Sequence, residues 1–288
     1  MAEYFKCQCN IIFVRPLQVA LQSYVSYRAC ITLYQHCSRF TAGGPGIFKT
    51  VYIKLKMSTV SSNTLVNKLF GKAILKNFFD ALSYSQEGED KILDRFFEHR
   101  NKGFFVDVGA HDPIRFSNTY KFYLKGWRGI NIDAMPGSMH AFNEHRPSDT
   151  NIEAAISDKE EVLTYYAFNE PALNGFSKAL SDTRDGQKGY KIIFTKEIRT
   201  QRLSALLEQH VPRGTVIDFM SVDVEGLDLN VLQSNDWINY RPQVLLVEIT
   251  GFDPANMAGN ETAAYLDKIG YKFLAKTINT VLFADSQR

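Results

Sequence analysis

Short apolar runs alternate with amphipathic segments along most of the chain, from residue 104 to the C-terminus. Apolar runs of a few residues predict buried strands, and apolar positions three or four residues apart predict helices. The predicted strands are 104–108, 129–132, 151–156, 161–168, 191–199, 216–222, 244–249, 271–275 and 280–283. The predicted helices are 118–125, 137–146, 203–209, 227–233 and 261–269. This alternation predicts a single doubly wound α/β domain.

Two of these strands, 161–168 and 191–199, are additions to the regular alternation. Gly175, Gly186 and Gly189 mark turns in the segment between them, for which no regular structure is predicted. The last two strands lie close enough in the sequence to form a hairpin through Asn279.

The pattern before residue 104 predicts two helices. Residues 62–82 carry apolar residues every three to four positions, and their polar face holds Lys68, Lys72 and Lys76. Such a helix packs across the end of a sheet or, alternatively, lies on a membrane surface. A second helix is predicted over residues 86–99, with Ser85 as its N-cap and acidic residues in its first turn.

Charge divides the chain into two parts. The whole chain has 33 Lys and Arg against 31 Asp and Glu, and its formal net charge is +2. Residues 1–56 hold seven of the basic residues and one acidic residue, so residues 57–288 are net acidic. This excludes the basic stripe of a nucleic-acid-binding protein. All four cysteines lie in residues 1–37 at spacings that match no zinc motif, and we therefore expect no metal site.

Three parts are expected along the chain. Residues 1–56 are expected to be a dispensable basic extension or a start-site artefact ahead of Met57, residues 57–100 a helical segment, and residues 101–288 the main domain. No apolar stretch reaches the ~18 uninterrupted residues of a membrane span. We therefore expect no transmembrane helix and a cytoplasmic location.

Acidic residues follow the first two predicted strands. Asp107 and Gly109 end the first strand, and Asp133 ends the second, 26 positions after Asp107. At about this spacing in doubly wound folds a carboxylate accepts hydrogen bonds from ribose hydroxyls. The Gly-x-Gly-x-x-Gly loop that binds a pyrophosphate is absent, and His111 stands where its second glycine would be. The pattern favours a nucleoside ligand, and the alternative is that Asp107 and Gly109 only form a tight turn.

A second acidic group follows the strand predicted at 216–222. Ser221, Asp223 and Glu225 project to one side if the chain stays extended, because side chains alternate along a strand. Two neighbouring carboxylates raise each other's pKa for acid-base chemistry, or together hold a divalent cation. The alternative is that Glu225 caps the following helix and Asp223 alone is functional.

Four segments of this chain resemble the FkbM family of S-adenosylmethionine-dependent methyltransferases. They are Ser-Tyr-Ser-Gln-Glu-Gly-Glu-Asp at 83–90, Phe-Val-Asp-Val-Gly-Ala at 105–110, Gly-Trp-Arg-Gly-Ile-Asn-Ile-Asp at 126–133 and Ser-Val-Asp-Val-Glu-Gly at 221–226. Their order and spacing match the family over residues 83–283. The resemblance implies a Rossmann-like sheet of seven strands whose last strand is antiparallel. The cofactor is then a nucleoside that carries no phosphate, which agrees with the missing glycine loop.

The resemblance also implies roles for individual residues. By analogy the methionine part of S-adenosylmethionine contacts Asp107, Gly109 and Ala110, the ribose binds Asp133, and the adenine lies near Ser157 or Asp158. The acceptor is expected to be a hydroxyl on a saccharide, a glycan precursor or a secondary metabolite. Its proton needs a base, for which Asp223 is the first candidate, with His111 second and Glu225 also available. Aromatic residues of the inserted region form a stacking wall for a sugar or belong to the core: Tyr165, Tyr166, Phe168, Phe176 and Tyr190.

Two other functions stay open on the sequence alone. One is a nicotinamide-dependent sugar oxidoreductase, which would need the missing glycine loop and a Tyr-x-x-x-Lys pair that the segment around Tyr123 lacks. The other is a nucleoside-binding module of methyltransferase fold that has lost turnover. His111-Asp112-Pro113 motivates it, because proline stiffens a loop in which many family members carry a small residue.

Overall fold

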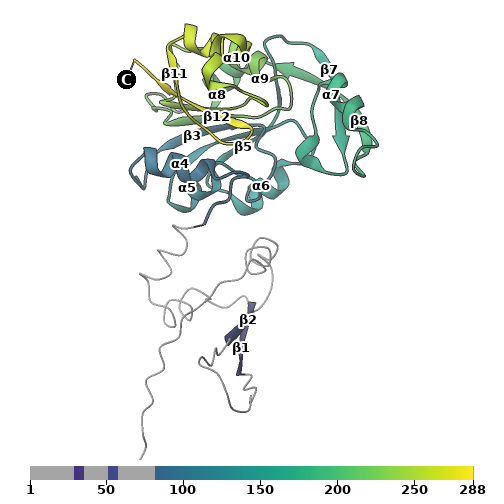
Figure 1. Cartoon of the computed structure of the whole chain (residues 1–288), viewed down its shortest axis with the longest axis vertical. Helices are drawn as coiled ribbons and strands as arrows, with labels where there is room; N and C mark the ends of the chain where they lie inside the picture. Colours follow the sequence, from purple (N-terminus) through teal and green to yellow (C-terminus); the bar gives the residue numbers. More distant parts are fainter. Residues whose placement is uncertain (1–28, 36–50, 58–81, 288) are drawn as a thin grey trace, which may run out of the picture. The chain divides into compact units, whose positions relative to one another are not determined.

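The structure is a computed structural model that describes residues 29–35, 51–57 and 82–287 (Figure 1). The chain divides into two units, Met1–Leu82 and Ser83–Arg288. In the first unit, β1 (Ala29–Gln35) and β2 (Val51–Met57) pair antiparallel. The helix predicted at 62–82 lies outside the described residues, apart from residue 82. No helix of the described part is long and apolar enough to cross a membrane.

A seven-stranded sheet forms the centre of the second unit, in the order β11-β12-β10-β9-β3-β4-β5. All neighbouring strands pair parallel except β12, which is antiparallel to both β10 and β11. This confirms the predicted sheet and its antiparallel last strand. The strands are β3 (Phe104–Val108), β4 (Arg128–Asp133), β5 (Thr150–Glu153), β9 (Phe219–Val222), β10 (Val244–Glu248), β11 (Tyr271–Lys276) and β12 (Thr280–Asp285).

Helices cover both faces of this sheet (Figure 1), and the alternation of side chains along β3 shows why. Val106 packs with apolar residues of the helices on one face, and Phe105 packs with those on the other face. The first face is covered by α8 (Leu203–His210), α9 (Asp228–Gln233), η2 (Pro254–Gly259) and α10 (Glu261–Lys268). The second is covered by α4 (Glu89–Phe96), α5 (Tyr120–Leu124) and α6 (Met139–His145).

The start of α4 differs from the prediction. The N-cap is Gly88, whose backbone is in the left-handed region with φ +95° and which offers no side-chain hydrogen bond to the helix. The prediction of Ser85 as N-cap was therefore wrong. Ser85 instead forms an isolated bridge with Phe116, which keeps the chain extended there. Its hydroxyl still reaches the helix, because it accepts a hydrogen bond from the backbone N–H of Asp90 at 3.2 Å.

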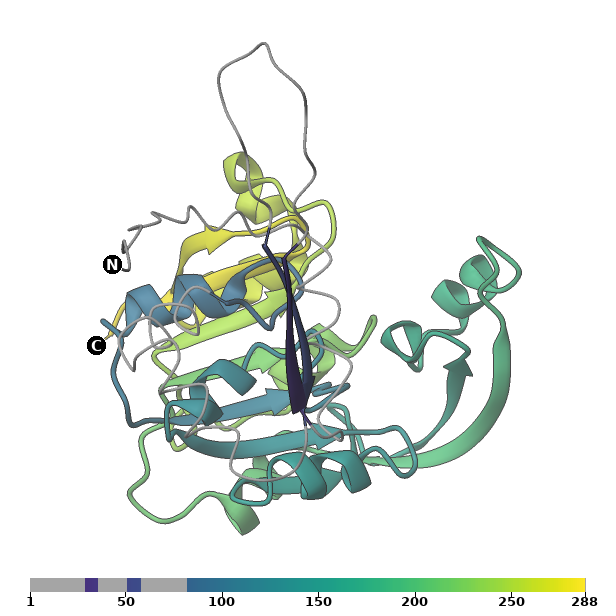
Figure 2. The same cartoon turned by 90° about the horizontal axis from the view of Figure 1, so that it is seen from below.

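The segment predicted as one strand at 151–156 is two strands. β5 ends at Glu153 in the main sheet, and β6 (Ala155–Ile156) pairs with β8 (Ile192–Gln201) in a second sheet. β7 (Val162–Phe168) completes that sheet, in the order β6-β8-β7, which confirms the two additional strands. Between them lie η1 (Pro171–Leu173) and α7 (Lys178–Arg184), where only turns were predicted. This inserted region extends beyond the main sheet (Figure 2).

Candidate active site

A pocket of about 370 Å³ opens at the carboxyl ends of β3, β4, β9 and β10. It lies where the strand order reverses between β3 and β9, the place at which doubly wound sheets bind ligands. Residues 171–176 and Arg184 of the inserted region form its outer wall. Seven of the nine residues predicted from the sequence line it: Asp107, Gly109, Ala110, His111, Asp133, Asp223 and Glu225.

The turn after β3 requires glycine at residue 109. Gly109 has φ +83°, and a Cβ atom there would lie 1.6 Å from the backbone oxygen of Asp223. The backbone N–H groups of Gly109 and Ala110 both donate to the carbonyl oxygen of Ile132, at 2.9 and 3.0 Å. The turn therefore packs tightly between β4 and the acidic loop after β9.

Asp133 is held at the end of β4 by two backbone hydrogen bonds. Its carboxylate accepts from the N–H of His111 at 2.9 Å and from the N–H of Met135 at 2.8 Å. Burial raises the pKa of Asp133 above its ordinary value, although these donors oppose the shift. Each carboxylate oxygen can accept a further hydrogen bond from a ligand.

His111 has a neutral imidazole at the mouth of this turn. Burial lowers the pKa of its ring, although the neighbouring Asp133 carboxylate acts in the opposite direction. The ring stacks on Phe116 with centroids 6.3 Å apart. Its Nε2 atom is buried and has no hydrogen-bond partner among the described residues. The turn that follows is stable because the carboxylate of Asp112 accepts from the N–H groups of Ile114 and Arg115, at 2.8 and 2.7 Å.

A buried polar network beneath Asp107 was not predicted from the sequence. Thr119 donates its hydroxyl hydrogen to Asp107 at 2.8 Å and accepts from Arg146 at 2.9 Å. Arg146 is fully buried and also pairs with Asp149 at 2.9 Å. Burial raises the pKa of Asp107 to about 6, against the opposing effect of Arg146 and Thr119. The sequence shows an arginine at the end of the predicted helix 137–146, but not that this arginine is buried.

Thr119→Val should destabilise the fold by about 1–3 kcal/mol, because it keeps the side-chain shape but removes the hydroxyl that donates to the buried Asp107 and accepts from the buried Arg146. Urea denaturation gives the free energy of unfolding. Thr183→Val is the control, since Thr183 is exposed and its hydroxyl donates to a carbonyl of its own helix. Equal free energies of unfolding for the two variants would show that the buried network does not stabilise the fold.

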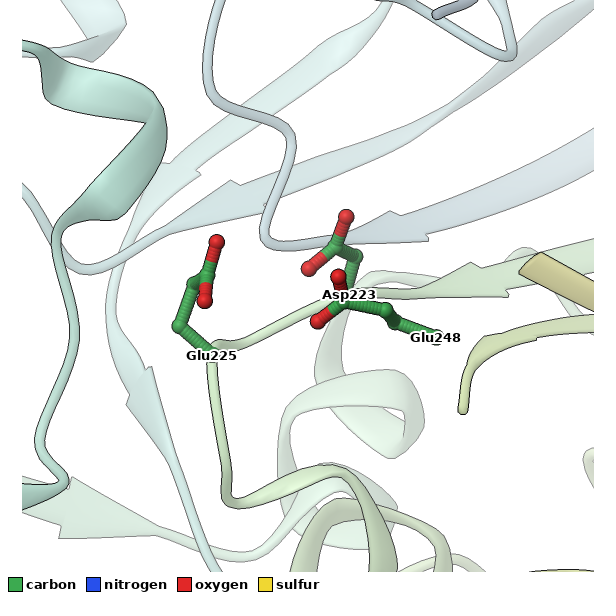
Figure 3. Close-up of side chains that lie close together, drawn as sticks. All are labelled: Asp223, Glu225 and Glu248. Atoms are coloured by element: carbon green, nitrogen blue, oxygen red, sulfur yellow. The ribbon is translucent and has the colours of Figure 1, made fainter. Parts of the chain in front are cut away.

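Three carboxylates that line the pocket lie close together (Figure 3). Asp223, Glu225 and Glu248 each present an oxygen within 4.8 Å of the others. Burial raises the pKa of all three, that of Asp223 well above its ordinary value and that of Glu248 to about 7. Glu225 forms an ion pair with Arg184 at 2.7 Å. Glu248 was not predicted as a site residue.

The helix after Glu225 is fixed by another acid. Asp228 accepts from the N–H groups of Val224 and Gly226, at 3.1 and 3.2 Å, and so closes the turn before α9. Glu225 therefore does not cap this helix, and its carboxylate instead pairs with Arg184 in the pocket wall. Grouped carboxylates either share protons or hold a divalent cation, the two alternatives that the sequence left open.

Ser157 and Asp158 do not line this pocket. Because the chain leaves the main sheet after Glu153, these residues turn toward α9, where Asn230 donates to the Asp158 carboxylate at 2.8 Å. Ala154 and Ile156 line the pocket on this side.

The inserted region contributes part of the predicted aromatic wall. Tyr165 and Phe176 line the pocket with ring centroids 5.1 Å apart, whereas the other three predicted aromatics do not line it. An ion pair between Arg115 and Glu170 at 3.0 Å ties this region to the turn after β3. Four side-chain amides also line the pocket: Gln86, Asn118, Asn174 and Asn279.

Residues 107–273 match the family described as the methyltransferase FkbM domain. No curated protein sequence matches the chain. One similar solved structure is phosphoethanolamine N-methyltransferase 1 of Haemonchus contortus, in complex with phosphoethanolamine and S-adenosylhomocysteine. The identity is 15%, the TM-score is 0.30, and the match covers 78% of this chain but 42% of that one, so the chain spans less than half of its length. The family match covers more than half of this chain, which belongs to the methyltransferase FkbM domain family.

Proposed function

We propose that this protein is an S-adenosylmethionine-dependent O-methyltransferase. Its acceptor is a hydroxyl group on a saccharide, a glycan precursor or a secondary metabolite. The reaction takes place in the cytoplasm. The turn after β3 carries the proposal. The N–H groups of Gly109, Ala110 and His111 all donate to protein oxygens, so none of the three is available to a pyrophosphate. The site therefore suits a nucleoside without phosphates better than a nicotinamide dinucleotide.

The residues of this half of the pocket fit such a cofactor. Asp133 would hold the ribose, and Asp107, Gly109 and Ala110 would hold the methionine part. Ala154 and Ile156 offer the adenine an apolar surface, in the place that the sequence analysis gave to Ser157 and Asp158. When bound, S-adenosylmethionine would supply a methyl group from its positively charged sulfur. The sulfur would be left as a neutral thioether, and the acceptor oxygen would gain the methyl group and lose its proton.

The other half of the pocket has the groups that a hydroxyl acceptor needs. The side-chain amides of Gln86, Asn118 and Asn279 can donate to and accept from hydroxyl groups. Asp223 lies at a rigid strand end and takes the acceptor proton as general base. His111 is the second candidate, because burial lowers the pKa of its ring and its Nε2 atom has no hydrogen-bond partner in the described part of the chain.

Asp133→Ala should weaken binding of S-adenosylhomocysteine by about 10- to 100-fold. A hydrogen bond to a charged group contributes roughly 1.5–3 kcal/mol, and each 1.4 kcal/mol is tenfold in affinity. Titration calorimetry on the full chain measures the dissociation constant, with NAD as a competing ligand. Asp158→Ala is the matched control, because Asp158 lies outside the pocket and should leave the affinity unchanged.

Two results would contradict the cofactor assignment. One is stronger binding of NAD than of S-adenosylhomocysteine by the unaltered protein. The other is an Asp133→Ala variant that binds S-adenosylhomocysteine as tightly as the unaltered protein does.

A further inference from the structure

Glu248 lies next to Asp223 because of the register of two parallel strands. Val222 of β9 is paired with Val247 of β10, so the residues that follow them lie side by side: Asp223 just after the end of β9, and Glu248 as the last residue of β10. Their carboxylates converge on the same part of the pocket (Figure 3). Four consecutive residue pairs between β9 and β10, in the centre of the sheet, define this register and so keep Asp223 and Glu248 close together.

The surroundings of this pair are mostly negative. Arg184 is the one lysine or arginine among the described residues that line the pocket, and its guanidinium group pairs with Glu225. No lysine or arginine of the described chain forms an ion pair with Asp223 or Glu248. The charged groups that act on the pair are Glu225 in the same loop, Asp228 of α9, Asp107 of β3, Glu87 before α4 and Arg184 of α7. Four of these five are carboxylates, so the environment opposes ionisation of both members.

We propose that Asp223 and Glu248 hold one proton between them and work as one acid-base unit. In this unit Glu248 is a positioning residue, which acts on the acceptor through Asp223. The inference rests on the proposed function, in which Asp223 is the general base. Glu248 would set the basicity of Asp223. The acceptor hydroxyl gives its proton to the pair as its oxygen gains the methyl group, and the pair then releases that proton to solvent.

Burial and the neighbouring carboxylates set the pH range in which the pair titrates. Burial is the main cause that raises the pKa of Asp223 and brings that of Glu248 to about 7, and repulsion between the acids adds to it. At this pair the folded protein therefore binds more protons than the unfolded chain between about pH 4 and pH 7. Its stability should fall as pH rises through this window, because the buried acids lose their shared proton.

Glu248→Gln provides a test that needs no acceptor. Removing one of two neighbouring acids should raise the melting temperature relative to the unaltered full chain, by a difference that is small near pH 5 and grows up to pH 8. Glu144→Gln is the control, since Glu144 is exposed on α6, and its difference should not change with pH. Asp223→Asn should give the same pH-dependent difference and replaces Glu248→Gln if that variant fails to fold.

The pH profile of turnover is the second measurement. The acid limb of kcat/KM should move down by about one pH unit or more in Glu248→Gln, because Asp223 no longer faces a second carboxylate. Failure of the proposed function would appear as absent S-adenosylhomocysteine binding with the stability difference intact.

Two results would overturn the proton-sharing pair. One is a melting-temperature difference for Glu248→Gln that stays constant from pH 5 to pH 8. The other is a rise in melting temperature on addition of MgCl₂ that Glu248→Gln removes, which would assign the three carboxylates to a divalent cation.

Discussion

Gly109→Ala is expected to weaken binding of S-adenosylhomocysteine at least 100-fold. The added Cβ atom would lie 1.6 Å from the backbone oxygen of Asp223, so either the turn after β3 or the loop after β9 must move by more than an ångström. Both loops line the pocket, and a shift of either displaces groups proposed to hold the cofactor. The positive φ of residue 109 adds about 1 kcal/mol or more of backbone strain.

Gly137→Ala separates the steric effect from the backbone strain. Gly137 has nearly the same φ, +82°, but the nearest atom to its added Cβ would be the Cδ2 of His140 at 3.8 Å. This variant should lose only about 1 kcal/mol of stability and keep its affinity. Calorimetry gives the dissociation constants, and urea denaturation shows whether Gly109→Ala is folded. Equal affinities in the two variants would show that the turn after β3 does not hold the cofactor.

The strands of the main sheet could be predicted because most are buried on both faces. The run Phe104–Val108 is apolar except for Asp107, and its predicted bounds are those of β3. The break between β5 and β6 could not be predicted in the same way. It depends on the N–H of Ala154, which bonds the carbonyl of Asp133, and on pairing of Ala155 and Ile156 with residues 45 positions later. A local apolar pattern carries no information on such distant partners.

The pocket residues that the sequence revealed share one property, which is their position at or just after the carboxyl end of a strand. Glu248 has the same property, since it ends a run of four apolar residues, and the strand-end rule applied to β10 would have found it. Thr119 precedes α5 and Arg146 follows α6, and both act through Asp107, so a rule based on strand ends does not find them. Their role follows from burial, which becomes visible only when the chain is folded.

Asp223→Asn is expected to lower turnover by about 10² to 10⁴-fold, the usual contribution of a positioned general base, while S-adenosylhomocysteine binds with unchanged affinity. Asparagine has nearly the same shape as aspartate but cannot accept the acceptor proton. The side chain is grouped with those of Glu225 and Glu248 and not with Asp133, the proposed ribose ligand, so the affinity for the cofactor should not change. Formation of S-adenosylhomocysteine from S-adenosylmethionine, with a panel of saccharides as acceptors, measures turnover.

Glu160→Gln is the control for this measurement, because Glu160 is exposed and outside the pocket, and it should keep full turnover. Full turnover by Asp223→Asn would transfer the role of base to His111, which lines the pocket and whose Nε2 atom has no hydrogen-bond partner within the described ranges. Binding of S-adenosylhomocysteine by the unaltered protein without turnover of any acceptor class would instead favour the nucleoside-binding module. In that protein the turn after β3 would keep its ligand. The pKa values of Asp223 and Glu248 would still be raised, that of Glu248 to about 7, because burial and mutual repulsion do not depend on an acceptor.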